Sequence, residues 1–463
     1  MFKRKLLLGG LVACSMAAAT ANAAVSADEA AHLKSDLTPF GSEKAGNKEG
    51  TIPEWTGGIT KEQIPKTYTT PGQHHPDPFS EEKPVVVITK ANMNQYAAHL
   101  TEGQKALFTT YPDTFKMPIY PTHRTHNLPD WVIQNTFKNA TTAQLAEGGN
   151  GVVNAFGGTP FPVPKANGQY DPLMVLWNHI LRFRGTYIVR SASEVAVQRN
   201  GEYSLVTSQQ EAYFPYYKKD GKYEDLNNII FYYLSYTISP ARLAGGAVLV
   251  HETLDQSKEP RQAWGYNAGQ RRVRRAPNLA YDTPIAASDG LRTADDTDMY
   301  NGAPDRYDWK LLGKKEIYIP YNNYKLGAEN TKYADILKVG HINPDLARYE
   351  LHRVWVVQGT LKPGMRHIYS KRTFYLDEDS WSIAAADQYD SRGQLWRVSM
   401  TYLKSYYEVP LTWSTLDVFH DLQAGRYHVQ FLDSEEPKTI DFSREAPPQS
   451  YFTPAALRRR GVR

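Results

Sequence analysis

Residues 396–402 read WRVSMTY, and this stretch decides the fold class. Large apolar side chains alternate with polar ones along it, which is the period-two pattern of a β-strand with one apolar face. Turn-forming residues occur at 390–393 (DSRG) and, one strand earlier, at 377–380 (DEDS). Successive strands joined by short turns predict an antiparallel meander.

The same alternation extends over residues 185–436, with six further strands predicted before residue 396. They are Thr186–Arg190, Ser204–Tyr213, Ile229–Tyr236, Ala247–His251, Leu351–Gly359 and Arg366–Tyr375.

Residues 89–184 predict helices instead. Thr101 and Gln104 have the spacing of a capping box, Asp130 can cap a second helix, and Asp171-Pro172 opens a third.

Residues 24–88 combine a short helix beginning near Ser26 with an irregular arm rich in Pro and Gly. The predicted organisation is therefore residues 1–23 as a signal peptide, 24–88 as helix and arm, and 89–463 as one large domain that ends in a C-terminal tail.

The N-terminus predicts export. A basic start at 3–5 precedes an uncharged, mostly apolar run at 6–19, and 21–23 (Ala-Asn-Ala) supplies a small-x-small cleavage site. Cleavage after Ala23 removes Cys14, the single cysteine, and excludes disulfides and thiolate chemistry from the mature protein. A lipoprotein that begins at Cys14 is the alternative. The expected location is the periplasm.

The charge balance gives no reason to propose nucleic acid as a partner. The chain has 53 Lys and Arg against 49 Asp and Glu, a net charge of +4, and three of the positive charges lie at residues 3–5. The mature surface is therefore nearly neutral. Aromatic residues make up 12% of the chain, including 31 Tyr, which predicts a large core with aromatic walls.

The strand Ile229–Tyr236 is apolar on both faces, so neither face should meet bulk water. Either the sheet is packed between two layers, or one face lines an apolar cavity that could hold an acyl chain or terpenoid, at ~25 cal/mol per Å² of buried apolar surface. The residues predicted to line such a cavity are Ile229, Phe231, Tyr233, Trp396, Met400 and Tyr402.

No catalytic residue, cofactor or metal site is predicted. Neither G-x-S-x-G nor H-E-x-x-H occurs, and the histidines at 74–75 and at 123 and 126 lack nameable further ligands. Dispersed carboxylates that act on a carbohydrate or ester stay open as an alternative. One cluster of acidic residues comprises Asp295, Asp296, Asp298, Asp305 and Asp308. Its spacing is not that of an EF-hand loop, and it predicts a solvated loop.

The densest basic run is RRVRR at 271–275. In a strand, Arg272 and Arg274 share one face, whereas Arg271 and Arg275 lie on the other. One interpretation is an edge strand protected by charge, and the other is a contact for lipid head groups or an acidic partner.

Four blocks carry a family resemblance. The chain has AGNKEGTIPEWTGG at 45–58, GGTPFP at 157–162, QRRVRRAP at 270–277 and, within 295–321, DRYDWK. Together they resemble the DUF1329 family of exported proteobacterial proteins over nearly the whole mature chain. That family is similar in fold to the LolA/LolB/LppX group of lipoprotein and lipid carriers.

The resemblance implies an α+β, mainly β fold: a strongly curved antiparallel sheet, or half-open barrel, covered by helices. It also implies a periplasmic carrier or chaperone for a hydrophobic small molecule or lipid, with an inner-membrane exporter of the resistance-nodulation-division (RND) type and an outer-membrane protein as possible partners. It carries over no catalytic residues. A ligand-free accessory subunit of an exporter complex is a further alternative.

Overall fold

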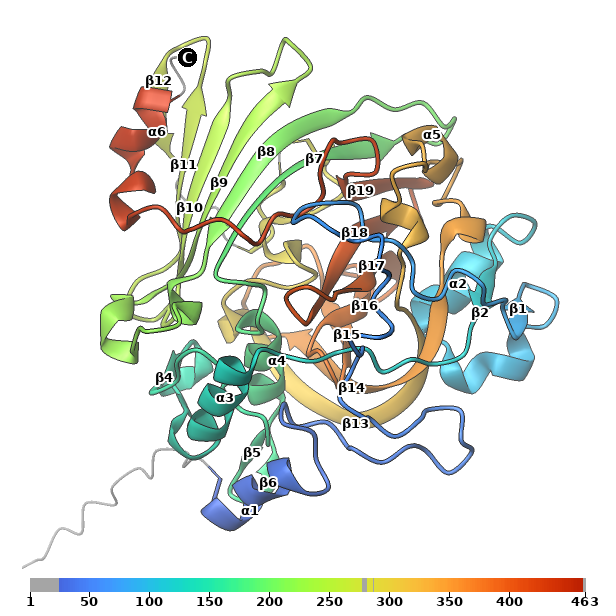
Figure 1. Cartoon of the computed structure of the whole chain (residues 1–463). Coiled ribbons are helices and arrows are strands. Elements are labelled where there is room, and N and C mark those ends of the chain that lie inside the picture. Colours follow the sequence, from blue (N-terminus) through green and yellow to red (C-terminus); the bar gives the residue numbers. More distant parts are fainter. Residues whose placement is uncertain (1–24, 277–280, 286, 461–463) are drawn as a thin grey trace, which may run out of the picture.

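One strongly curved sheet of 15 strands dominates the molecule (Figure 1). The computed structural model describes residues 25–276, 281–285 and 287–460, so the predicted signal peptide and Cys14 lie outside the described residues. All neighbouring strands pair antiparallel except β2 and β14, which share one parallel bridge at Ile119 and Tyr349. The predicted mainly β, curved antiparallel sheet is confirmed.

The order of strands in the sheet differs from their order in the chain. The C-terminal strands, β14 to β19, form one meander, and its last strand pairs with β7, the first strand of the meander β7 to β12. From one edge to the other the strands are β1 (Val86–Ile88), β2 (Met117–Ile119), β14 (Tyr349–Leu361), β15 (Lys371–Asp377), β16 (Ile383–Tyr389), β17 (Leu395–Tyr406), β18 (Leu411–Asp421), β19 (Arg426–Leu432), β7 (Tyr187–Val197), β8 (Val206–Tyr213), β9 (Ile229–Ser239), β10 (Ala247–Thr253), β11 (Gln262–Asn267) and β12 (Arg272–Arg275), with β13 (Tyr307–Pro320) paired to β14.

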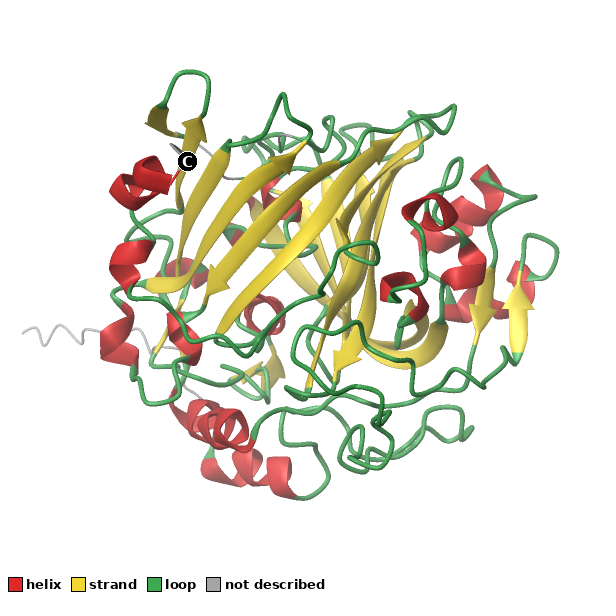
Figure 2. Cartoon of the chain, turned by 45° about the horizontal axis from the view of Figure 1, so that its top comes forward, coloured by secondary structure: helices red, strands yellow, loops and turns green. Residues whose placement is uncertain are grey.

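Helices and loops lie on both sides of the sheet (Figure 2). The α-helices are α1 (Ala27–Ala31), α2 (Glu102–Thr110), α3 (Asp130–Thr142), α4 (Pro172–Ile180), α5 (Tyr333–Ile336) and α6 (Pro454–Arg460), and two further short hairpins pair β3 (Gln144–Leu145) with β4 (Val152–Val153) and β5 (Lys165–Ala166) with β6 (Gln169–Tyr170). Among the described residues, no helix is long and apolar enough to cross a membrane.

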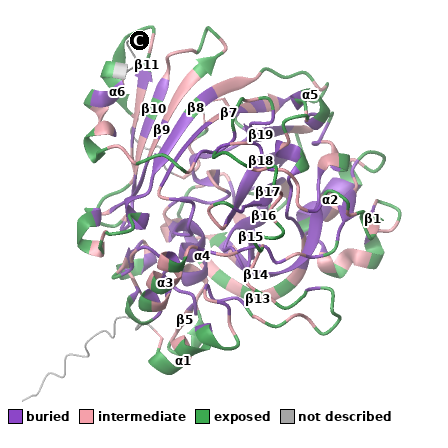
Figure 3. Ribbon diagram, in the orientation of Figure 1, coloured by how far each residue is buried: buried purple, intermediate pink, exposed green. Residues whose placement is uncertain are grey.

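The sheet has two faces with separate cores. The face that carries α4, here called the inner face, has one buried apolar cluster that includes Trp177 of α4 and Phe374 and Phe419 of the sheet. The outer face packs α2 against β16 and β17, with Phe108 and Met400 in one buried cluster. Burial is deepest in the central strands and lowest in the peripheral loops (Figure 3). Strand β9 is apolar on both faces because one face belongs to the inner core and the other packs in a third cluster beneath α6.

Local sequence signals place the predicted helix starts correctly in three cases. Ser26 is the N-cap of α1, and its side chain accepts a hydrogen bond from the Glu29 N–H. Thr101 and Gln104 form the expected capping box of α2, and the Asp171 side chain accepts hydrogen bonds from the first backbone N–H groups of α4. For α3 the N-cap is Pro129 rather than Asp130, which is the first helical residue.

A buried carboxyl of the sheet supports the start of α2. The Gly103 N–H donates to Asp387 Oδ1 at 3.0 Å, and the Tyr375 hydroxyl donates to Oδ2 at 3.1 Å. Burial raises the pKa of Asp387 to about 7. The folded state therefore favours the protonated carboxyl.

We expect this carboxyl to make stability depend on pH. Because its pKa is higher in the folded than in the unfolded chain, its contribution is fully present below the unfolded pKa and is lost as pH rises through 7. Urea unfolding should be measured for wild type and Asp387→Asn at pH 5 and pH 8. Between these pH values the free energy of unfolding of the wild type should fall by about 3 kcal/mol more than that of the variant. A difference that does not change with pH would contradict the burial of an ionisable group here.

Candidate functional site

Beside its apolar core, the inner face has a lining of polar side chains. Cross-strand register carries this lining from β15 through β18 and β19 to β7 and β8. The side chains, all buried or half-buried, are Arg372, Gln388, Arg397, Ser399, Thr401, Asp417, His428, Gln430, Arg190, Glu194 and Gln210. Buried charges need partners.

Residues 291–301, here called the inner segment, supply partners for many of these groups. Asp295 and Asp296 lie in a 3-10 turn, and their carboxylates contact the two terminal nitrogens of Arg372 at 2.6 and 2.7 Å. His367 Nε2 lies 3.0 Å from Asp295. Burial alone would raise the pKa of Asp295, but Arg372 and His367 outweigh it and hold that pKa well below its usual range.

Asp298 connects the same segment to the end of α4. Its carboxylate lies 2.5 Å from both the Arg182 and the Arg184 guanidinium, and the Trp413 indole N–H donates to it at 3.3 Å. Burial opposes ionisation of this carboxyl, but the two arginines hold the pKa of Asp298 well below its usual range.

The inner segment reaches from β10 to β18. Arg292 lies 3.8 Å from Glu194 and over the Phe419 ring, while the Asn301 amide donates to buried Glu252 at 3.0 Å. The expectation of a solvated loop at Asp295, Asp296 and Asp298 is therefore wrong. Asp295 and Asp296 are buried against Arg372 of the sheet, and Asp298 is half-buried against the two arginines that follow α4, whereas Asp308 is exposed as expected.

The predicted cavity residues do not share one cavity. Phe231 and Tyr233 belong to the inner core, whereas Ile229 lies in the cluster under α6. Met400 and Tyr402 are buried on the outer face, where the Tyr402 hydroxyl contacts that of Tyr349 at 3.0 Å. The sixth residue, Trp396, is half-buried and donates to Asp421 at 2.9 Å. Met400 and Tyr402 therefore lie across the sheet from Phe231 and Tyr233.

An open space lies at the rim of the inner face. It is a groove of about 800 Å³, within the usual range of ligand sites. Three segments form its walls: the end of β7 with the turn into β8, the turn between β9 and β10, and residues 287–289. The lining residues are Ala196, Gln198, Gly201, Glu202, Tyr203, Ser204, Val206, Arg242, Leu243, Ala287 and Asp289.

No sequence signal pointed to this groove. Tyr203 and Leu243 lie in turns, where an apolar side chain looks like an ordinary surface residue. In the structure they are 36% and 40% exposed and face one hollow. Only the tertiary arrangement of three separate turns identifies them as neighbours.

The basic run forms the edge strand β12, as one of its two interpretations expected. Arg272 and Arg274 lie on the side of the sheet shared with Gly265 and Val248, and Val273 and Arg275 on the side of α6. Arg271 precedes the strand in a left-handed conformation (φ 51°). All four arginines are exposed.

Buried and half-buried histidines contact polar groups of the protein. His75 lies 2.9 Å from Glu408 and His123 2.6 Å from Glu82, while His126 contacts the Thr412 hydroxyl at 3.1 Å. One group of three side chains within the described residues has the spacing of metal ligands: His352, Asp377 and Asp379.

Comparison with known proteins gives consistent relatives. Residues 87–458 match the model of the family described as "Protein of unknown function (DUF1329)". An uncharacterized protein of Pseudomonas aeruginosa is 51% identical over 463 residues, covering 99% of both chains.

Two solved structures are also similar. A DUF1329 family protein from Desulfovibrio piger is 16% identical with a TM-score of 0.40, and a LolA superfamily protein from Nitrosomonas europaea is 13% identical with a TM-score of 0.35. Each match covers 59% of this chain and 92% of the other. On the family model and the Pseudomonas relative, the chain belongs to the DUF1329 family.

Proposed function

We propose that the protein is an exported carrier or chaperone that binds the hydrophobic part of a lipid, or of a lipid-bearing partner, in the groove at the rim of its inner face. The observation that carries this is the groove itself, because it is open, about 800 Å³ in volume and lined by both apolar and charged side chains. A carrier needs no reacting group, and the closely spaced carboxylates Asp295, Asp296 and Asp298 are paired with arginine.

The groove offers the two kinds of contact that an amphiphile needs. Tyr203, Val206 and Leu243 provide apolar surface, and full burial of one Leu side chain stabilises a complex by about 1.5–3 kcal/mol. Arg242 and Asp289 add charged groups at the same site. Further exposed apolar side chains, Ile238 and Val248, lie on the adjoining strands β9 and β10.

The setting that we propose is the periplasm. The basic start, apolar run and cleavage site of residues 1–23 support export. Delivery between membranes requires partners, and the exposed arginines of β12 are a surface where an exporter of the RND type or an outer-membrane protein could dock.

We expect Leu243→Asp to weaken binding of a hydrophobic probe by about 10–100-fold, because a carboxylate replaces apolar contact surface in the groove. The measurement is fluorescence titration of the purified protein with N-phenyl-1-naphthylamine, followed by displacement with a phospholipid. Leu312→Asp is the matched control, since Leu312 on β13 is also 40% exposed and does not line the groove.

Wild type and Leu312→Asp should bind alike. A wild type that binds neither the probe nor the phospholipid would refute the carrier function. Binding that Leu243→Asp and Leu312→Asp reduce equally would show that the groove is not the binding site.

A further inference from the structure

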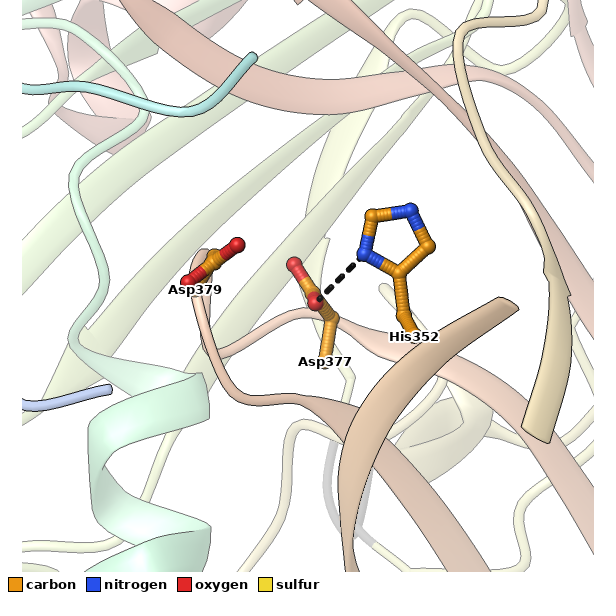
Figure 4. Close-up of side chains that lie close together, drawn as sticks. All are labelled: His352, Asp377 and Asp379. Atoms are coloured by element: carbon orange, nitrogen blue, oxygen red, sulfur yellow. Dashed lines mark ion pairs between the residues drawn. The ribbon is translucent and has the colours of Figure 1, made fainter. Parts of the chain in front are cut away.

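The side chains of His352, Asp377 and Asp379 lie close together (Figure 4). His352 belongs to β14, Asp377 ends β15, and Asp379 lies in the turn that follows. All three residues are at most 2% exposed, and their potential ligand atoms lie within 4.8 Å of one another. The group is far more buried than an ordinary surface cluster of acidic residues.

The contact between His352 and Asp377 is not a hydrogen bond. Nδ1 and Oδ1 are 3.7 Å apart, which is too long for one. Two ligands of a single ion, each about 2.0–2.2 Å from it, lie about 3–4 Å apart. Oδ1 of Asp377 is buried and has no hydrogen-bond partner among the described residues. A buried oxygen without a hydrogen-bond partner is expected to contact a donor, a water or an ion.

The side chains around this group hold the ligand atoms in place, as the outer shell of a metal site does. His352 Nε2 lies 3.2 Å from Glu350, which matches the carboxylate–histidine–metal arrangement and leaves Nδ1 free to act as a ligand. The Ser380 N–H and hydroxyl donate to Oδ2 of Asp377 at 2.9 and 2.6 Å. Arg124 donates to both oxygens of Asp379 at 2.9 and 2.6 Å, and each oxygen keeps a second lone pair.

The charge balance of the surrounding network leaves room for a divalent cation. The ion pairs that connect to this group include six carboxylates, Glu43, Glu82, Glu350, Asp377, Glu378 and Asp379, and four permanent cations, Arg124, Lys314, Arg348 and Arg353. Two negative charges remain when only these permanently charged groups are counted; His352 and His123 also pair with Glu350 and Glu82, and Glu43 is exposed. Buried carboxylates without compensation are strongly destabilising.

We propose that His352, Asp377 and Asp379 bind one first-row divalent cation, Zn²⁺ or a similar ion, as a structural site. One nitrogen and two carboxylate oxygens form a donor set that such ions accept. The buried Tyr321 ring packs against that of His352, with ring centroids 4.0 Å apart, and helps to fix the imidazole.

The site would fasten the arm to the sheet. Arg124, which holds Asp379, also donates to the backbone carbonyls of Glu43 and Lys44 in the arm. Fixing Asp379 therefore fixes the arginine that anchors the arm. This role is independent of ligand binding in the groove.

The test is refolding of the full chain from denaturant with Zn²⁺ or with a chelator, followed by desalting, metal analysis and thermal unfolding. We expect about one Zn²⁺ per chain and a higher melting temperature for the Zn²⁺-refolded protein. Asp377→Asn should bind Zn²⁺ about 100-fold more weakly. Asp387→Asn is the matched control, because Asp387 is an equally buried carboxyl outside the group.

Wild-type protein that retains no more Zn²⁺ than Asp377→Asn, with the same melting temperature in Zn²⁺ and in chelator, would overturn the site. The comparison of wild type with and without Zn²⁺ requires no variant, so it decides the matter even if Asp377→Asn fails to fold.

Discussion

Replacement of Arg372 by alanine is expected to lower the free energy of unfolding by at least about 3–5 kcal/mol, or to prevent folding. Arg372 is fully buried and holds Asp295 at 2.6 Å and Asp296 at 2.7 Å. Without it, two carboxylates of the inner segment lose their closest cation in a site closed to water. The measurement is urea unfolding followed by circular dichroism.

Two controls separate the loss of charge pairing from a general effect of mutation. Arg272→Ala, on the exposed edge strand, should change stability by no more than about 0.5 kcal/mol. Arg372→Met should lower the free energy of unfolding much less in a protein that also carries Asp295→Asn and Asp296→Asn than in the wild type, because no unpaired carboxylate remains. Equal losses in both backgrounds would show that packing, and not charge, sets the effect.

Asp298→Ala is likewise expected to lower the free energy of unfolding by about 3–5 kcal/mol, in this case because positive charges lose their partner. Removing this carboxylate leaves the Arg182 and Arg184 guanidiniums close together and unpaired at the end of α4. Both arginines are buried, at 3% and 5% exposure. Urea unfolding at low and high salt measures the loss, which salt should relieve only weakly because the site is buried.

The control is Asp308→Ala, since Asp308 is exposed on β13 and should tolerate the change within about 0.5 kcal/mol. Additional loss is expected when Asp298→Ala is combined with Arg372→Ala. A stable Asp298→Ala protein would mean that the inner segment is not held by its charges.

These contacts bear on how a carrier of this fold could work. On the inner face, where an apolar cavity was expected, the structure has a packed apolar core and the chain's own ion pairs at Asp295, Asp296 and Asp298. The apolar surface that stays accessible is at the rim, around Tyr203 and Leu243. A ligand bound there is only partly enclosed, which suits transfer to another protein.

Much of the sheet follows from local patterns. The period-two alternation at 396–402 predicts β17, and the turns at 377–380 and 390–393 separate β15, β16 and β17 as expected. β13 could not be predicted this way. Its 14 residues carry charges at alternating and adjacent positions, and most of its length is exposed or half-buried, so no apolar face marks it as a strand.

The candidate sites depend on contacts between distant residues, and for that reason the sequence did not reveal them. Asp295 and Arg372 are 77 positions apart, and nothing local distinguishes a buried carboxylate from a solvated one. The groove requires three turns to converge, and the histidine–aspartate group requires β14 and the turn after β15 to be neighbours. The DEDS turn at 377–380 was visible in the sequence, but its partner His352 was not.

The most direct test of the carrier function is photo-crosslinking with a diazirine-bearing fatty acid, followed by peptide mapping of the labelled residues. Labels are predicted on the groove, in peptides that contain Tyr203–Val206 and Arg242–Leu243. Labels confined to the inner-face strands β17 and β18 would show that the ligand displaces the inner segment and enters the interior, and would contradict the groove as the binding site.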